Sequence, residues 1–271
     1  MKRLIPAVIC IFALALALSG CGISVGLGGL GTRYDVNEEK ELEAAGARSV
    51  KIDTVSDDII VRSGGDKVLA RLTGECRSTS KPVWLDARRS GDSIIIEVEY
   101  PIGITNCDTM LEVTIPEGFA GDFEAGTVSG DVEADGLALK LGEVNTHTVS
   151  GAIRFSSESC SRVKAETTSG VITLSRLACE VDAHSISGNI ELDYDVFAAS
   201  KADTVSGGVE VTLPQEAAFR VQFDSVSGNF SSTHSGVGVS HADGGFSAEA
   251  NGGGALLEVG TTSGGFRLAG K

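Results

Sequence analysis

A short phrase built on Ser-Gly recurs through the second half of the chain at a nearly constant interval. The serines of this phrase are Ser129, Ser150, Ser169, Ser187, Ser206, Ser227 and Ser263. Successive serines are 21, 19, 18, 19, 21 and 36 residues apart. The last interval is close to two periods, and Asp243-Gly244 lies where a hidden copy would divide it into 16 and 20 residues. A fixed period of about 19 residues predicts a solenoid of stacked repeats.

Small or apolar residues alternate with polar residues on both sides of each Ser-Gly. Ala165 and Thr167, for example, lie four and two residues before Ser169. Ile172 and Leu174 lie three and five residues after it. This period of two is typical of short strands with one buried face. Because glycine supplies the backbone freedom that a sharp corner needs, each repeat is predicted to be strand, Ser-Gly corner, strand and loop. The serines are interpreted as corner groups, and no catalytic residue is predicted.

These patterns predict an all-β fold: a parallel β-helix or β-solenoid with about 19 residues per rung. Equivalent strands of successive rungs would pair about 4.8 Å apart. A β-sandwich or an antiparallel roll is the alternative, since short strands at short spacing also suit those folds.

An imperfect copy of the repeat precedes the regular array. Residues 50–61 read VKIDTVSDDIIV, in which Asp57 replaces the corner glycine. Residues 62–67 (RSGGDK) and 88–93 (RRSGDS) are typical of hairpin turns. We therefore predict that residues 47–120 form an N-terminal β region, whose hairpins start the solenoid and cap its open edge, and that residues 121–271 form the repeat solenoid.

The first residues have the pattern of an export signal. Lys2 and Arg3 precede an apolar stretch over residues 4–18, which is too short for a membrane span. It ends in Leu-Ser-Gly-Cys at residues 18–21, which resembles the lipobox of bacterial lipoproteins. The resemblance implies that residues 1–20 are a lipoprotein signal peptide and that Cys21 carries the lipid. An ordinary secretory signal is the alternative. Residues 21–46, rich in glycine at first, are predicted to be a flexible tether.

The remaining cysteines are even in number, which suits disulfides in an oxidising compartment. Cys160 and Cys179 lie ten residues after Ser150 and Ser169, at the same position of consecutive repeats. In a stacked solenoid they would be close enough for a disulfide. By elimination, Cys76 and Cys107 are predicted to be the second pair. The alternative is free thiols that pack as small hydrophobes.

The chain is strongly acidic. Removal of residues 1–20 leaves 20 cations and 37 acids, a net charge of −17. Such a chain is repelled by nucleic acid and by anionic polymers, so nucleic acid is excluded as a partner.

One outward column combines imidazole and carboxylate groups. His147, Glu166, His184, Asp203 and Asp224 each lie three residues before a corner serine. Two interpretations are open: a solvated ladder of alternating charge, or a divalent metal site formed by His147, Glu166 and His184. The ladder is favoured, and no cofactor is predicted.

The repeats resemble a bacterial adhesin-like family catalogued as domain of unknown function 4097. The matching residues are Thr-Val-Ser-Gly-Asp-Val at 127–132 with its later copies, Val-Thr-Ile-Pro at 113–116 and Val-Thr-Leu-Pro at 211–214. The resemblance covers roughly residues 47–271. It implies repeated β units on envelope-anchored proteins, and it supplies no catalytic residues.

Together these features predict a non-enzymatic, lipid-anchored protein on the extracytoplasmic face of a bacterial membrane, held there by its lipid. Its partner would be a protein or glycan ligand of unknown identity at a surface or in the envelope. The alternative is an accessory protein of envelope-stress signalling that binds a membrane partner. A glycan-active β-helix enzyme comes third, because the cations that such an enzyme needs beside its acids are scattered over different repeat positions.

Overall fold

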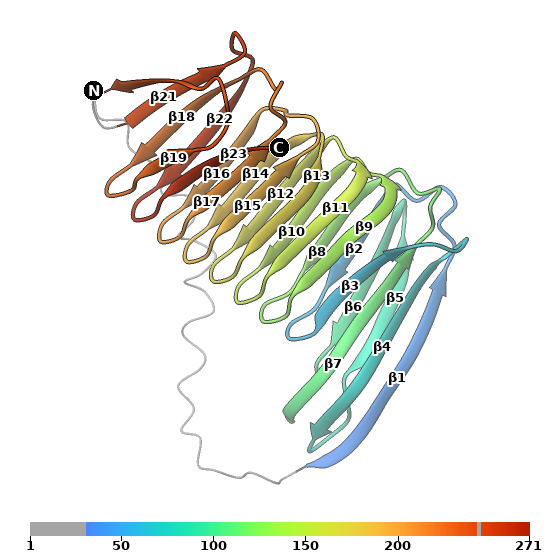
Figure 1. The fold of residues 1–271 in the computed structure, drawn as a ribbon. Helices are drawn as coiled ribbons and strands as arrows, with labels where there is room; N and C mark the ends of the chain where they lie inside the picture. Colours follow the sequence, from blue (N-terminus) through green and yellow to red (C-terminus); the bar gives the residue numbers. More distant parts are fainter. Residues whose placement is uncertain (1–30, 243–244) are drawn as a thin grey trace. The chain divides into compact units, whose positions relative to one another are not determined.

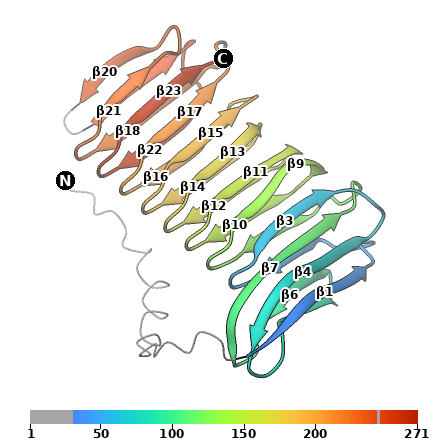
Figure 2. The same ribbon diagram turned by 60° about the horizontal axis from the view of Figure 1, so that its bottom comes forward.

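The computed structural model describes residues 31–242 and 245–271, which form two β-sheets (Figure 1). One sheet has the strand order β1-β4-β7-β3-β9-β11-β13-β15-β17-β23-β19, which we call sheet A. The other, sheet B, has the order β20-β21-β18-β22-β16-β14-β12-β10-β8-β2-β6-β5. The long middle of both sheets is parallel (Figure 2). The predicted all-β solenoid is therefore confirmed.

A rung consists of one strand of sheet B, a corner and one strand of sheet A. In stacking order the rungs of the described residues are β6 (Ser93–Glu99) with β7 (Ile104–Ile115), β2 (Ser49–Asp53) with β3 (Asp58–Ser63), β8 (Asp122–Gly126) with β9 (Val132–Lys140), β10 (Glu143–Thr148) with β11 (Ile153–Ser159), β12 (Arg162–Thr167) with β13 (Ile172–Leu177), β14 (Glu180–Ser185) with β15 (Ile190–Tyr194), β16 (Ser200–Thr204) with β17 (Val209–Leu213), β22 (Ala255–Thr261) with β23 (Phe266–Gly270), and β18 (Phe219–Ser225) with β19 (Phe230–Ser232).

The core lies between the two sheets and follows the alternation in the sequence. Val163 and Ala165 of β12 and Ile172 and Leu174 of β13 are fully buried, whereas the residues between them face outward. Equivalent residues stack in register, as in the pairs Ala165–Ala183 and Ile172–Ile190. Each fully buried Val, Ile or Leu side chain contributes about 1.5–3 kcal/mol relative to exposure, and the stacking repeats that contribution along the solenoid.

The Ser-Gly corners stack so closely that only glycine fits. A Cβ atom on Gly151 would lie 1.8 Å from the carbonyl oxygen of Gly130, and one on Gly170 would lie 1.9 Å from that of Gly151. The same carbonyls accept hydrogen bonds from threonine hydroxyls of the next rung, at 3.1 Å from Thr148 and 3.3 Å from Thr167. The corner glycine and the threonine three residues before it are thus both explained by contact with the preceding rung.

The N-terminal region closes one end of the solenoid with antiparallel strands. β5 (Trp84–Ser90) pairs with β6 through the predicted turn at residues 88–93. β4 (Val68–Ser78) pairs with β7, and β1 (Thr32–Leu42) pairs with β4. The turn at residues 62–67 joins β3 to β4, but these two strands do not form the predicted hairpin, because β7 lies between them in sheet A.

The prediction of a tether through residue 46 is wrong for residues 32–42, which form β1. The tether is predicted from the glycine-rich run at the start of residues 21–46, and that run does not extend into this charged stretch. A charged strand suits the edge of a sheet, where it discourages pairing with other chains.

The C-terminal rungs do not follow the order of the sequence. The rung of β22 and β23 lies between the rung of β16 and β17 and that of β18 and β19, although it comes last in the chain. The hidden copy predicted at Asp243-Gly244 lies outside the described residues. Its flanking strands, β20 (Gly238–Ala242) and β21 (Gly245–Ala250), pair antiparallel with each other, and β21 pairs antiparallel with β18. They form a closing hairpin and not an eighth parallel repeat.

The corner contact predicts the effect of adding one methyl group. Gly151→Ala should lower the free energy of unfolding by about 1–3 kcal/mol or more, because the new Cβ meets backbone and not a movable side chain. Gly118→Ala is the matched control, since a Cβ there meets nothing within 4 Å. Urea denaturation of both variants would measure the difference, and equal stabilities would contradict the stacking.

Candidate functional site

The predicted lipid site, Cys21, lies outside the described residues and stays a prediction. Among the residues that the structure does describe, no helix is long and apolar enough to cross a membrane. Because Cys21 lies outside the described residues, the sites described below are those of the solenoid.

Cys160 and Cys179 are brought together by the stacking of consecutive rungs. They lie in the loops that follow β11 and β13, with Cα atoms 5.9 Å apart, and their sulfur atoms are bonded. The rung alignment read from the sequence accounts for this proximity. The bond joins two loops on the side of the solenoid opposite the Ser-Gly corners.

Cys76 and Cys107 face each other across the antiparallel ladder of β4 and β7, but both are free thiols. The predicted bond between them is thus absent from the structure, although elimination correctly placed the two residues side by side. Burial raises the pKa of the Cys107 thiol to about 12. Because disulfide exchange proceeds through the thiolate, this burial disfavours oxidation of the pair.

The outward column predicted on sheet B is present. His147 pairs in register with Glu166, Glu166 with His184, and His184 with Asp203. The prediction of an unbroken column to Asp224 is wrong, because Gly260 of the inserted rung lies between Asp203 and Asp224.

The side chains of this column contact charged neighbours, many of them on the same strand. Nε2 of His184 lies 2.7 Å from Oδ1 of Asp182, and Nζ of Lys164 lies 3.0 Å from Oε1 of Glu166. His147, Glu166 and His184 are therefore not a set of converging ligands, and the arrangement favours the charged ladder.

Another group of carboxylates does converge on the described surface. Asp86, Glu97 and Glu99 have potential ligand atoms all within 4.8 Å of one another. Arg88 lies among them, with Nη1 2.6 Å from Oε2 of Glu97 and also in contact with Asp86. The guanidinium group already pairs with both of these acids and offsets one of their two charges.

A buried carboxylate, which sequence reasoning missed, lies where the glycine ladder begins. Asp57 is fully buried, and its carboxylate accepts hydrogen bonds from the hydroxyls of Tyr100 and Thr109. Desolvation raises the pKa of Asp57, and the two hydrogen bonds offset part of that effect. The sequence signal was the replacement of the corner glycine by Asp57 in the first copy.

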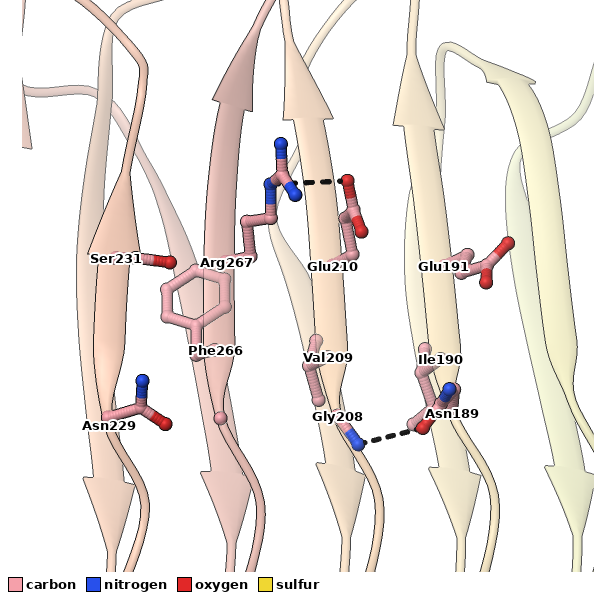
Figure 3. Close-up of a pocket in the computed structure, with 11 residues that line it drawn as sticks. Asn189, Ile190, Glu191, Gly208, Val209, Glu210, Asn229, Ser231, Phe266 and Arg267 are labelled. Carbon is pink, nitrogen blue, oxygen red and sulfur yellow. Dashed lines mark hydrogen bonds and ion pairs between the residues drawn. The ribbon is translucent and has the colours of Figure 1, made fainter.

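A polar groove runs over the outward face of sheet A near its C-terminal end. One part has a cavity volume of about 220 Å³ and is bounded by Asn189, Asn229, Glu210 and Arg267 (Figure 3). A second part, of about 380 Å³, is lined by Thr173, Ser175, Asp193 and Thr212. Both parts include Glu191 and Glu210, so they adjoin.

The groove is floored by backbone where two rungs lack a side chain. Gly208 and Gly265 occupy the same repeat position on neighbouring rungs, with Asn189 and Asn229 at that position on either side. The backbone N–H of Gly208 donates to Oδ1 of Asn189 at 2.9 Å. Arg267 and Glu210 lie side by side on the neighbouring strands β23 and β17, with Nε of Arg267 3.6 Å from Oε1 of Glu210 (Figure 3).

A two-sheet parallel solenoid with stacked Thr-x-Ser-Gly corners defines a class of repeat proteins. The chain belongs to the Toastrack family, DUF4097, whose family model matches residues 119–269. The family resemblance inferred from the repeats is thereby confirmed. No curated protein sequence matches the chain.

Three solved bacterial structures are also similar to this chain. A "putative cell adhesion protein" from Clostridium sporogenes shares 12% identity with a TM-score of 0.39, covering 88% of this chain and 100% of that chain. A "putative adhesin" from Bacteroides fragilis shares 11% with a TM-score of 0.41, covering 86% and 97%. A "putative adhesin" from Parabacteroides distasonis shares 11% with a TM-score of 0.45, covering 89% and 98%. These likenesses are distant, and the assignment rests on the family match.

The disulfide leads to a measurable prediction. The double variant Cys160→Ser/Cys179→Ser should lose about 3 kcal/mol of unfolding free energy, the value expected for a closed loop of about 20 residues. As a control, a reductant should destabilise the wild type and leave the variant unchanged. Peptide mapping under non-reducing conditions tests the pairing directly, and a bond from Cys160 to Cys76 or Cys107 would refute it.

Asp57 predicts a dependence of stability on pH. Its folded-state pKa is raised above the ordinary value of 3.8, so the folded state binds the proton more tightly than the unfolded state. The contribution of Asp57 to stability should therefore decrease as pH rises from below 3.8 through the raised pKa. Asp57→Asn should abolish this contribution, which is measured as the wild-type minus variant difference in unfolding free energy across pH. A difference that does not change with pH would contradict the buried carboxylate.

Proposed function

We propose that this protein is a non-enzymatic, lipid-anchored protein of the bacterial cell envelope whose solenoid provides a binding surface for adhesion or for an envelope component. Cys21 is the proposed point of attachment. The partner would be a protein or a glycan that contacts several rungs at once.

One observation carries the binding role: the hollow described on the solenoid is a shallow groove on the face of a sheet, spread over neighbouring rungs. Small-molecule and catalytic sites are usually enclosed clefts that bury most of their ligand. Solenoids, in contrast, use extended surfaces to bind extended partners. The groove therefore favours a macromolecular ligand over a small substrate.

The Ser-Gly phrase supports the non-enzymatic part of the proposal. Thr148 and Thr167 bond to corner carbonyls, and the neighbouring backbone N–H of Ser169 donates to the carbonyl oxygen of Val149 at 2.9 Å. At these corners the threonine hydroxyls and the backbone of the serine form structural hydrogen bonds, so the repetition of the phrase does not require a catalytic explanation.

The anchor is tested by lipid labelling. Wild-type cells fed a fatty-acid analogue should label the protein, and Cys21→Ala should abolish the label and release the protein from the membrane fraction. Cys10→Ala, in the apolar stretch of the predicted signal, is the matched control and should label normally. An unlabelled wild type would overturn the lipid anchor.

The binding role is tested separately with a deletion strain. Loss of the protein should reduce attachment of the cells to host surfaces or to isolated envelope material, and wild-type protein should restore it. Unchanged attachment to both would overturn the adhesive function.

A further inference from the structure

We propose that the groove on sheet A is a glycan-binding subsite that takes a chain of amine-bearing or neutral sugars. The inference deepens the proposed function and rests on it, since it names the chemical class of the ligand that the surface binds. It is carried by the shape of the groove, its polar lining and its charge.

The groove arises from glycine residues on regular strands, and not from a distortion of the backbone. Val209 pairs in register with Phe266, and Phe266 pairs with Phe230, so the strands continue without a bulge beneath the hollow. The hollow lies above Gly208, where the nearest atoms to a Cβ would be 3.7 Å away. At Gly265, which also has no side chain, the amide of Asn229 reaches over the backbone, and a Cβ atom would lie 2.9 Å from its Oδ1. A regular sheet with missing side chains provides a rigid depression, and a rigid site loses little conformational entropy on binding.

The lining suits the hydroxyl groups of sugars. Oδ1 of Asn189 is occupied by the N–H of Gly208, whereas its amide NH2 has no recorded partner among the described residues. Glu210 and Arg267 lie side by side at the groove and present acceptors and donors on planar groups. Adjacent sugar hydroxyls both donate and accept, so they match such paired planar groups.

The second part of the groove extends the site beyond a single ring. It continues from Glu191 over Thr173 and Ser175 of β13 and over Asp193 and Thr212 of neighbouring strands. Its hydroxyl and carboxylate groups repeat the polar character of the first part. The joined hollows therefore fit several linked sugars lying across the rungs, and not one isolated monosaccharide.

The charge of the groove selects among glycans. Nζ of Lys271 lies 2.7 Å from Oδ1 of Asp193, and Arg267 pairs with Glu210. Glu191 has no cation within ion-pair distance among the described residues. Residues 100–271 contain 9 cations and 23 acids, a net charge of −14. This field repels anionic sugars and attracts amino groups.

A peptide ligand fits the groove less well. Peptides that bind tightly insert aromatic or aliphatic anchors into apolar pockets, or they add a strand to a free sheet edge. This groove lies on the face of sheet A, and the ring of Phe266 points into the core with 1% of the residue exposed. The absence of an exposed ring in the described lining also predicts weak binding per site, strengthened when many copies act together.

The test measures binding of the full-length protein, purified in detergent, to three immobilised hexasaccharides of equal length. These are a chitosan hexamer, which carries amines, a cello-hexaose, which is neutral, and an oligogalacturonate hexamer, which is anionic. Biolayer interferometry should show affinity in the order amine-bearing, neutral, anionic. Glu191→Gln should weaken binding of the amine-bearing probe and leave binding of the neutral probe unchanged, because it removes a carboxylate that has no cation within ion-pair distance among the described residues.

A steric variant tests the location of the site. Gly208→Val should weaken binding at least tenfold by filling the hollow. The fold should tolerate it, since the nearest atoms to a Cβ at Gly208 lie 3.7 Å away. Gly118→Val, on an exposed loop with open space around it, is the matched control and should bind as the wild type does. Circular dichroism and unfolding curves of both variants should match the wild type.

Three outcomes would overturn the inference. Binding of no hexamer at millimolar concentration would exclude the glycan class, and if cells still attach through this protein, the proposed adhesive function survives with a protein ligand. Equal binding by Gly208→Val and wild type would place any glycan site elsewhere. Preferential binding of the anionic probe would refute the charge argument. Unchanged attachment of the deletion strain, both to host surfaces and to envelope material, would instead refute the proposed function.

Discussion

The contact between corner glycines of successive rungs is the constraint on which the rest of the solenoid depends. At Gly188 a Cβ atom would lie 1.7 Å from the carbonyl oxygen of Gly170, and at Gly207 it would lie 2.2 Å from that of Gly188. Such contact fixes the position of each rung along the stacking direction of the solenoid. It therefore also fixes the register of the two strands that flank each corner. On the opposite side of the rungs such contacts are found at Gly121 and Gly254, where a Cβ atom would lie 2.2 Å from the carbonyl oxygens of Arg48 and Ala218. The spacing between successive corner serines in the regular array varies between 18 and 21 residues.

Both ends of the solenoid are closed by the same device. Strand β2, the first parallel strand in the chain, lies between β6 and β8, and β23, the last strand, lies between β17 and β19. In each case a later or earlier segment forms the outermost rung. Antiparallel strands pair with both strands of that rung at the end formed by β6 and β7, and with β18 at the other end, where β19 is the edge strand among the described residues. The first and last rungs of the sequence are thus internal in space, which protects them from fraying and from edge pairing. The rung of β2 and β3 also explains Asp57, because its side chain meets Tyr100 and Thr109 where the glycine ladder begins.

The position of a residue within the repeat could be read from the sequence, and the features that depend on this position were predictable. Features that depend on which rung lies next to which were mostly not predictable. Alternation around Ser169 predicted which residues are buried, and the equal phase of Cys160 and Cys179 predicted their proximity. Stacking order was not predictable, because every rung presents the same inward face and can pack on any other. Strands β20 and β21, whose surrounding sequence resembled one more repeat, instead pair antiparallel with each other. The redox state of Cys76 and Cys107 depends on local burial, which spacing does not encode.

The unpredicted order of the rungs is also what creates the groove. In sequential order Gly208 would have Asn229 as its neighbour, since the rung of Ser227 follows that of Ser206 in the chain. The inserted C-terminal rung instead places Gly265 beside Gly208 and moves Asn229 one rung further away. Two adjacent positions without side chains then lie between two asparagines. Inward positions and corners are fixed by stacking, so the outward positions are those free to vary for recognition. Which outward residues lie side by side depends on the order of the rungs as much as on the repeat. A ligand that spans these rungs would therefore contact a set of residues that the repeat alone does not bring together.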